Sequence, residues 1–202
     1  MRPRITIILV ALSIIAVGLY TLYWNNKGDG GAEGPKQQPL SQGANTGAFN
    51  ESFNRLLTAY YGVKDALVAS DTVKANKAAA ELQMAADSLK VDEIQGDSTG
   101  TIKETALSYT GTIVGSAKGF LGETTIDEKR KEFEMLTEAM WNLSRVVKYG
   151  GRKIYYQYCP MAFNDKGAYW MSNEREIRNP YFGDQMLECG KVEDSLDYSK
   201  KN

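Results

Sequence analysis

Four sulfur-containing residues near the C-terminal end form the pattern in this sequence that could do chemistry. Cys159 and Met161 are two positions apart in a segment that predicts an extended chain, so their side chains point to one side. Met186 and Cys189 are three positions apart on a presumed helical turn and also share a side. The two pairs could converge on a site of two thiolates and two thioethers. Such soft ligands select Cu(I), or Ag(I) as its mimic, over zinc.

A disulfide between Cys159 and Cys189 is the alternative interpretation. They are the 2 cysteines of the chain, and lone cysteines in an oxidising compartment usually pair. The bond would close a loop of about 30 residues and contribute roughly 3–4 kcal/mol in the chain-entropy treatment. From spacing alone the disulfide is favoured over the metal site. Because both need the cysteines close together, proximity by itself does not separate them.

Composition excludes most kinds of catalytic site. Histidine is absent from all 202 residues, which removes Ser-His-Asp chemistry, Cys-His nucleophiles and every His-based metal site. The sequence also has no Gly-rich phosphate loop and no C-x-x-C redox pair. We therefore expect no catalytic residues and no enzymatic activity. With a net charge of −1 at pH 7 and no basic patch, we expect no nucleic-acid partner.

Before the segment that carries the sulfur residues, the chain has an N-terminal apolar run. Residues 5–24 form an uncharged run of 20 residues, long enough for a helix to cross a bilayer. Arg2 and Arg4 precede it, so the positive-inside rule keeps the N-terminus in the cytoplasm and exports the rest. We expect residues 1–24 to be an uncleaved inner-membrane anchor, with a cleaved signal peptide as the alternative. In both cases the globular domain lies in the periplasm, either tethered by a single membrane span or released.

Composition also predicts the boundaries of the tether, the globular domain and the tail. Residues 25–48 are rich in Gly, Gln, Pro and Asn and predict a flexible tether. A helical-bundle domain is expected over residues 49–192, with a Cys/Met loop at residues 151–192. Residues 193–202 are charged and predict a frayed tail.

Hydrophobic periodicity predicts four amphipathic helices, so the fold is mainly α and the helices argue for an antiparallel four-helix bundle. We expect them to begin near Asn50, Asp71, Thr101 and Thr125. On the third helix three glycines at a spacing of four predict close packing of a neighbouring helix: Gly111, Gly115 and Gly119. Three methionines on the helices are interpreted as core fillers rather than ligands: Met84, Met135 and Met140.

The C-terminal segment that carries the two cysteines predicts a β-hairpin. Residues 154–158 and 168–171 are rich in β-forming side chains, with turn chemistry at residues 164–167. The aromatic residues of this hairpin are expected to pack it onto the bundle. A helical turn over residues 184–189, closed by Gly190, would carry Met186 and Cys189.

The C-terminal part of the chain resembles a bacterial domain family of unknown function (number 3347) in the stretch YYQYCPMAFNDKGAYWMSNEREIRNPYFGDQMLECGKV, residues 155–192. The first helix, with YYGVKDALV, and the Gly-Gly end of the fourth helix are also similar, so the resemblance covers about residues 49–192. The family occurs alone or appended to membrane-fusion adaptors of copper/silver-type heavy-metal efflux systems. The resemblance implies a periplasmic bundle that handles copper, with ligands at Cys159, Met161, Met186 and Cys189.

Residues and resemblance together predict a membrane-tethered periplasmic module that binds Cu(I) and is an accessory in copper handling or efflux. Its expected partners are the inner membrane, through residues 5–24, and a heavy-metal efflux protein or another envelope membrane protein. The alternative is a non-catalytic structural or protein-interaction bundle stapled by a Cys159–Cys189 disulfide.

Overall fold

The computed structural model describes residue 20 and residues 45–199, and the structural statements below concern these residues. The predicted anchor over residues 5–24 and the tether over residues 25–48 lie outside the described residues, except for Tyr20 and residues 45–48. In the part of the chain that is described, no helix combines the length and apolar character that a membrane span needs.

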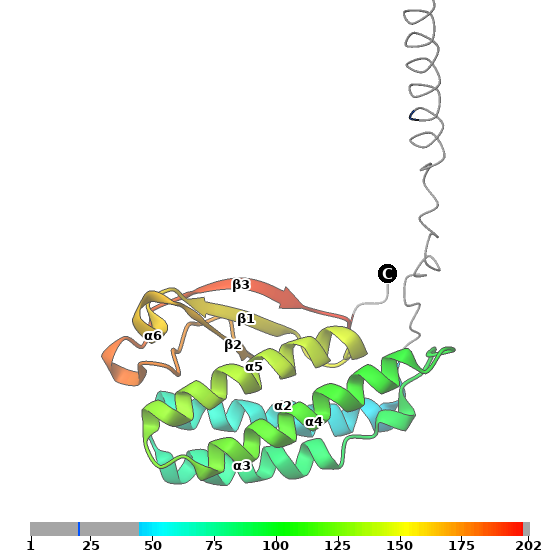
Figure 1. The fold of residues 1–202 in the computed structure, drawn as a ribbon, viewed down its shortest axis with the longest axis horizontal. Coiled ribbons are helices and arrows are strands. Elements are labelled where there is room, and N and C mark those ends of the chain that lie inside the picture. The colour runs from blue at the N-terminus through cyan, green and yellow to red at the C-terminus, as the bar shows by residue number, and fades with distance from the viewer. Residues whose placement is uncertain (1–19, 21–44, 200–202) are drawn as a thin grey trace, which may run out of the picture. The chain divides into compact units, whose positions relative to one another are not determined.

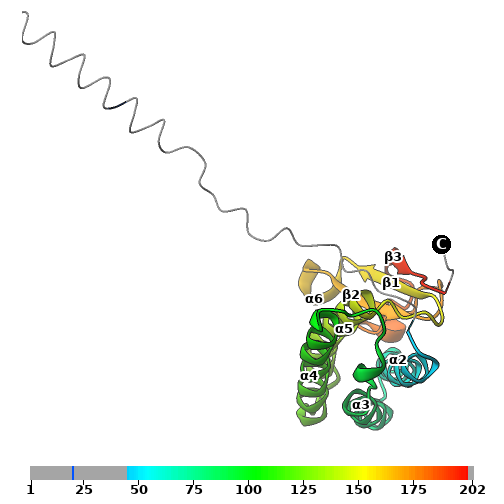
Figure 2. The ribbon, with the colours of Figure 1, turned by 90° about the vertical axis from the view of Figure 1, so that its right-hand side faces the viewer.

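Four long helices form the predicted bundle (Figure 1). They are α2 (Gly47–Val68), α3 (Thr72–Asp87), α4 (Thr101–Gly122) and α5 (Ile126–Val147). Each helix packs against the next one in the chain, and Figure 2 shows the four nearly end-on. A short 3₁₀ turn, η1 (Val91–Glu93), lies in the connection between α3 and α4. Short connections between α2 and α3, and between α4 and α5, make neighbouring helices antiparallel.

The start of α2 differs from the sequence prediction. We expected the helix to begin near Asn50, but it begins at Gly47, and the Thr46 side chain caps it by accepting a hydrogen bond from the Phe49 N–H. Asn50 instead accepts a hydrogen bond from the Gly150 N–H at 3.4 Å, so it joins the start of α2 to the end of α5. The starts predicted at Asp71 and Thr125 are confirmed: Asp71 caps α3, and Thr125 caps α5 in a capping box with Glu128.

The core lies between the helices and continues under the sheet. Tyr60 of α2 is fully buried and stacks on Phe133 of α5, with ring centroids 5.2 Å apart. Its hydroxyl bonds with the Thr137 hydroxyl at 2.7 Å and accepts the Met171 N–H at 3.0 Å. One buried side chain therefore ties α2, α5 and the sheet together.

Two predictions about the bundle are confirmed only in part. A Cβ at Gly111 or Gly115 would have no heavy atom within 4 Å, so α4 does not pack closely on a helix there, whereas one at Gly119 would lie 2.8 Å from the Glu132 side chain of α5. Ile113 and Ala117, on another side of α4, are buried instead. Of the three methionines expected in the core, Met140 is buried, whereas the other two are exposed: Met84 and Met135.

Three antiparallel strands form a small sheet of order β2-β1-β3. They are β1 (Ile154–Cys159), β2 (Ala168–Ser172) and β3 (Lys191–Leu196). The predicted hairpin is confirmed by the pairing of β1 with β2. The strand β3 was not predicted, and the expectation that residues 193–196 belong to a frayed tail is wrong. They pair with β1 instead, with a register shift between Tyr156 and Gln157.

The sheet covers the side of the bundle formed by α2 and α5 (Figures 1 and 2). Trp141 of α5 stacks on Tyr156 of β1 with centroids 4.1 Å apart, and Tyr156 stacks on Tyr169 of β2 at 4.7 Å. The hairpin aromatics therefore pack the sheet onto the bundle, as the sequence predicts. This packing fixes the position of the segment that carries the sulfur residues.

Candidate metal centre

The two cysteine thiols lie in contact. Cys159 is the last residue of β1 and is fully buried, whereas Cys189, two residues before β3, is partly exposed. Their Sγ atoms are 2.7 Å apart, and both are free thiols. The pairing of β1 with β3 explains this contact, because Tyr158 lies opposite Lys191 and the two cysteines flank that pair. We refer to Cys159 and Cys189 as the thiol pair.

Backbone groups around Cys189 join it to both methionines of the predicted ligand set. The Cys189 N–H donates to the Met186 carbonyl at 3.1 Å. The Met161 N–H points at the Cys189 sulfur and lowers the pKa of that thiol, but two larger effects oppose it. Burial first, and then the neighbouring Cys159 thiol, raise the pKa of Cys189 to about 11. Cys189 is therefore protonated at neutral pH.

Asn179 holds the segment before Cys189 in a closed loop. This buried side chain donates from Nδ2 to the Cys189 carbonyl at 2.9 Å and accepts the Tyr181 N–H on Oδ1 at 2.8 Å. Its own N–H donates to the Leu187 carbonyl at 2.8 Å. Three polar groups thus bind one asparagine, which fixes the loop that carries Met186 and Cys189 from inside.

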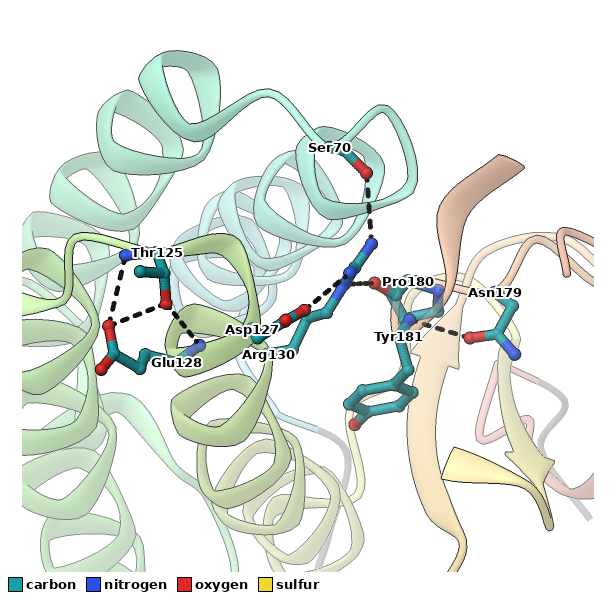
Figure 3. Close-up of polar contacts among 8 residues, drawn as sticks. All are labelled: Ser70, Thr125, Asp127, Glu128, Arg130, Asn179, Pro180 and Tyr181. Carbon is teal, nitrogen blue, oxygen red and sulfur yellow. Dashed lines mark hydrogen bonds and ion pairs between the residues drawn. The ribbon is translucent and has the colours of Figure 1, made fainter. Parts of the chain in front are cut away.

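Arg130 of α5 fastens this loop to the bundle (Figure 3). Its Nε donates to the Pro180 carbonyl at 2.9 Å, its Nη1 pairs with Asp127 at 3.2 Å, and its Nη2 donates to the Ser70 hydroxyl at 3.2 Å. Figure 3 shows the side chain reaching between the turn after α2 and the segment of Asn179 to Tyr181. The buried guanidinium uses its planar fork to join three parts of the chain.

Two glycines let the loop approach its neighbours closely. Gly183 has φ +58°, and a Cβ there would lie 2.7 Å from the Val68 carbonyl oxygen. Gly190, directly after Cys189, has φ +142°, and a Cβ there would lie 2.8 Å from the Tyr158 carbonyl oxygen and 2.9 Å from the Trp170 ring. A larger residue at either position would push the loop away from the bundle or from the sheet.

The connection between β1 and β2 is longer than the predicted tight turn. It contains the short helical turn α6 (Ala162–Asp165), in which Phe163, Asn164 and Asp165 have positive φ values of 53°, 58° and 64°. The predicted left-handed glycine is confirmed, with φ +82° at Gly167. The two-residue spacing of Cys159 and Met161 predicted that the extended strand continues through Met161. It does not, because Met161 has φ −87° and ψ −10°. Consecutive left-handed residues other than Gly are costly and cluster at binding sites in proteins.

Met161 and Met186 face a common cavity beside the thiol pair. The cavity has a volume of about 600 Å³, and its wall also includes Arg130, Phe163 and Tyr181. The side chains of Met161 and Met186 are 44% and 37% exposed. Neither cysteine is among the residues that line this cavity. We call it the methionine cavity. The structure therefore brings the two thiols together and places both methionines in the wall of one cavity.

The donor set fits a soft ion better than a hard one. Among the described residues, no three His, Cys, Asp or Glu side chains are grouped so that they could hold a metal ion. An ion at the thiol pair must therefore take any further ligands from the methionines or from the backbone. Two sulfurs that bind one ion at about 2.3 Å each lie roughly 3.5–4 Å apart. The thiols, at 2.7 Å, would have to separate by roughly 1 Å to hold one ion between them.

Sequence reasoning missed the residues that hold the loop. Arg130 lies on a helix whose periodicity was clear, but nothing in its spacing indicated a contact with Pro180, 50 positions away. Asn179 carried a weak signal, since Asn before Pro is typical of a turn. That signal predicted a turn without indicating that the Asn side chain binds the Cys189 carbonyl.

Comparison with known proteins gives a family but no described relative. No curated protein matches the chain, and no solved structure matches it. The model of a family described as "Protein of unknown function (DUF3347)" matches residues 56–150, from within α2 to just beyond α5. The matched span includes Arg130 and ends before the thiol pair. This is the family that the sequence resembles, and its model covers residues 56–150 of the chain.

Proposed function

We propose that this chain is a non-catalytic Cu(I)-binding module. Cys159 and Cys189 supply two thiolates that retain the ion, and Met161 and Met186 supply two thioethers beside them. The observation that carries the proposal is the contact of the two thiols, 2.7 Å apart, directly beside a cavity that both methionines line. Ag(I), which has the same soft character, would fit the same ligands.

The ligand types support copper over other metals. Zinc sites in proteins combine Cys with His or carboxylates in a tetrahedral shell. Histidine is absent from the chain, and the described residues contain no group of three His, Cys, Asp or Glu that could hold an ion. Cu(I) prefers thiolate and thioether sulfur as ligands, and two or three of them complete its coordination.

The fold would hold the thiols in reach of one ion while keeping Cys189 protonated in its absence. The pKa of Cys189 is raised to about 11, chiefly by burial, so an arriving ion has to displace a proton. Affinity should therefore fall as the pH is lowered. Because Asn179 and Arg130 fix the loop before the metal arrives, little chain entropy is lost on binding.

The cellular setting belongs to the same proposal. Residues 5–24 tether the module to the inner membrane, and the globular domain faces the periplasm, where it acts as an accessory in copper handling or efflux. The apolar run of residues 5–24 and the Arg residues before it support the tether. A heavy-metal efflux protein or another envelope membrane protein would deliver or receive the ion.

A second function is favoured by the same sulfur contact. A separation of 2.7 Å is closer to the roughly 2.05 Å of a disulfide than to the spacing of two sulfurs around one ion. In that case Cys159 and Cys189 are a permanent staple between the end of β1 and the start of β3, and the chain is a structural or protein-interaction module. Counting free thiols in protein isolated from its native compartment separates the two functions.

Titration of the full chain with Cu(I), reduced and anaerobic, against a competing chelator tests the proposal. We expect one Cu(I) per chain, lost in a Cys159→Ala/Cys189→Ala variant. Alanine avoids placing an unpaired hydroxyl at the buried Cys159 position. A Met84→Leu/Met135→Leu variant is the control, because these exposed methionines lie away from the thiol pair. Equal binding by the wild type and the cysteine variant would sink the proposal.

A further inference from the structure

We infer that Met161 and Met186 form a thioether site of their own, at which Cu(I) enters and leaves, separate from the thiol pair that retains it. This inference rests on the proposed function. It goes further by dividing the four sulfur residues into an exchange site and a retention site, and by fixing the order in which an ion meets them.

Solvent access differs sharply between the two sites. Cys159 has no exposed surface, whereas Met161 and Met186 are 44% and 37% exposed. Both methionines line one cavity of about 600 Å³, and neither cysteine lines it. Cys189 is partly exposed, so an ion that arrives from solution or from a partner protein meets the thioethers or Cys189 before it reaches the buried Cys159.

Backbone groups of both methionines lie next to Cys189. The Met161 N–H points at the Cys189 sulfur, and the Cys189 N–H donates to the Met186 carbonyl. Cys189, the more exposed of the two cysteines, is the thiol at which the ion would cross from one site to the other.

The chemistry of the ligands suits these two roles. A thioether is neutral and carries no proton, so Cu(I) binds it without displacing anything but water. Each thiol, in contrast, must lose its proton to solvent before its sulfur binds the ion. Transfer therefore breaks copper–thioether bonds, forms copper–thiolate bonds and releases one proton for each thiol that binds. Copper stays Cu(I) throughout, and no oxidant or reductant is needed.

Two other exposed methionines provide matched controls. Met84 and Met135 are 63% and 56% exposed, more than either member of the methionine cavity. Each lines a separate hollow with no second methionine in its wall. If exposure of a thioether were enough to bind a soft ion, these two residues would bind it as well as Met161 and Met186 do.

The first test asks whether the thioether site exists without the thiols. We would label the methionine methyl groups of the full chain with ¹³C in the Cys159→Ala/Cys189→Ala variant and titrate it with Ag(I), which needs no reductant. We expect the methyl signals of Met161 and Met186 to shift together at one equivalent, with those of Met84 and Met135 unmoved. Unmoved signals from Met161 and Met186, or equal shifts at all four exposed methionines, would overturn the inference.

The second test asks whether the thioethers exchange the ion or retain it. With the thiols intact, we expect a Met161→Leu/Met186→Leu variant to take Cu(I) from a chelator about tenfold more slowly, while its equilibrium affinity stays within about threefold of the wild type. The Met84→Leu/Met135→Leu variant should match the wild type in both. A loss of affinity as large as the loss of rate would make the methionines permanent ligands and end the inference.

The two tests also keep this inference apart from the proposed function. A wild-type chain that binds no Cu(I) at its thiols contradicts the proposed function, whereas the Ag(I) titration without thiols reports on the methionine cavity alone. A chain that retains Cu(I) at the thiol pair but shows no Ag(I) shift at Met161 and Met186 contradicts only the inference.

Discussion

Cys159 and Cys189 place their Sγ atoms 2.7 Å apart although 30 positions separate the two residues in the chain. Cys159 is fixed by its place at the end of β1, and Cys189 by the hydrogen bond from Asn179 and by the adjoining strand β3. Because neither position depends on a bond between the sulfurs, the two thiols remain neighbours in the reduced protein. The pair is therefore poised to respond to oxidants, to soft metal ions and to pH.

Oxidation should stabilise the protein. A Cys159–Cys189 disulfide closes a loop of about 30 residues, and the chain-entropy treatment gives roughly 3–4 kcal/mol for such a loop. We expect urea unfolding of the oxidised protein at pH 7 to show a free energy of unfolding higher by about this amount than that of the reduced protein. The Cys159→Ala/Cys189→Ala variant should give the same value with and without oxidant. Equal values for the two redox forms of the wild type would contradict this prediction.

The stability of the reduced protein should depend on pH through Cys189. Its pKa is raised to about 11, so the folded state holds this proton more tightly than the unfolded state does. The resulting stabilisation is complete below the ordinary pKa of a thiol and is lost as the pH rises towards 11. We expect the difference in unfolding free energy between the reduced wild type and Cys189→Ala to shrink between pH 8 and pH 11. Several buried tyrosines also titrate late, but they are common to both proteins and cancel. A constant difference would show that the thiol is not held protonated.

Arg130 should be important for stability. An Arg130→Met variant keeps an apolar stem but loses the bonds to Pro180, Ser70 and Asp127, and it leaves the Pro180 carbonyl without its buried donor. We expect a loss of about 2–3 kcal/mol in the free energy of unfolding. Lys131→Met is the matched control, since Lys131 is the next residue on the same helix and is exposed. A similar loss in both variants would mean that the effect comes from removing a positive charge from α5.

The helices were predictable because their periodicity reports directly on burial. Errors arose where a residue lay off the buried stripe. Met84 and Met135 each lie two positions from a buried residue, Leu82 and Phe133, which puts them on the opposite side of the helix. The prediction of close packing failed at Gly111 and Gly115 for a related reason, because the spacing of four aligns the glycines on one side of the helix without showing which side faces the bundle.

The candidate site was predictable in composition but not in geometry. The four sulfur residues were found from their types and spacing, yet the contact of the thiols depends on β3, which was not predicted. Residues 191–196, KVEDSL, are mostly charged or polar, and β3 is an edge strand that contacts only β1, so its sequence shows little burial. The methionine cavity depends on the left-handed turn at Phe163 to Asp165, and residues other than Gly give no sequence signal for that conformation.

The exposed glycines of α4 should be replaceable with a gain in stability. Gly111 and Gly115 lie inside a helix, and a Cβ at either position meets no heavy atom within 4 Å. We expect Gly111→Ala and Gly115→Ala each to raise the free energy of unfolding by about 0.5–1 kcal/mol, because alanine restricts the unfolded chain and favours the helix. Gly183→Ala is the contrasting control and should destabilise, since its Cβ would lie 2.7 Å from the Val68 carbonyl oxygen. Destabilisation by Gly111→Ala would show that this surface is covered in the folded protein.

Asn179 should affect the equilibrium constant for forming the Cys159–Cys189 disulfide. In Asn179→Ala the Cys189 carbonyl loses its 2.9 Å hydrogen bond and the Tyr181 N–H loses its acceptor, so the loop is freer to carry Cys189 away from Cys159. A lost hydrogen bond is worth about 1–1.5 kcal/mol, which corresponds to about a tenfold smaller equilibrium constant for disulfide formation. We would measure that constant against glutathione under conditions in which both proteins stay folded. Asn142→Ala, an amide on α5 outside the loop, should leave the constant unchanged. If Asn179→Ala also leaves it unchanged, the strands alone position Cys189, and the loop matters only for Met186.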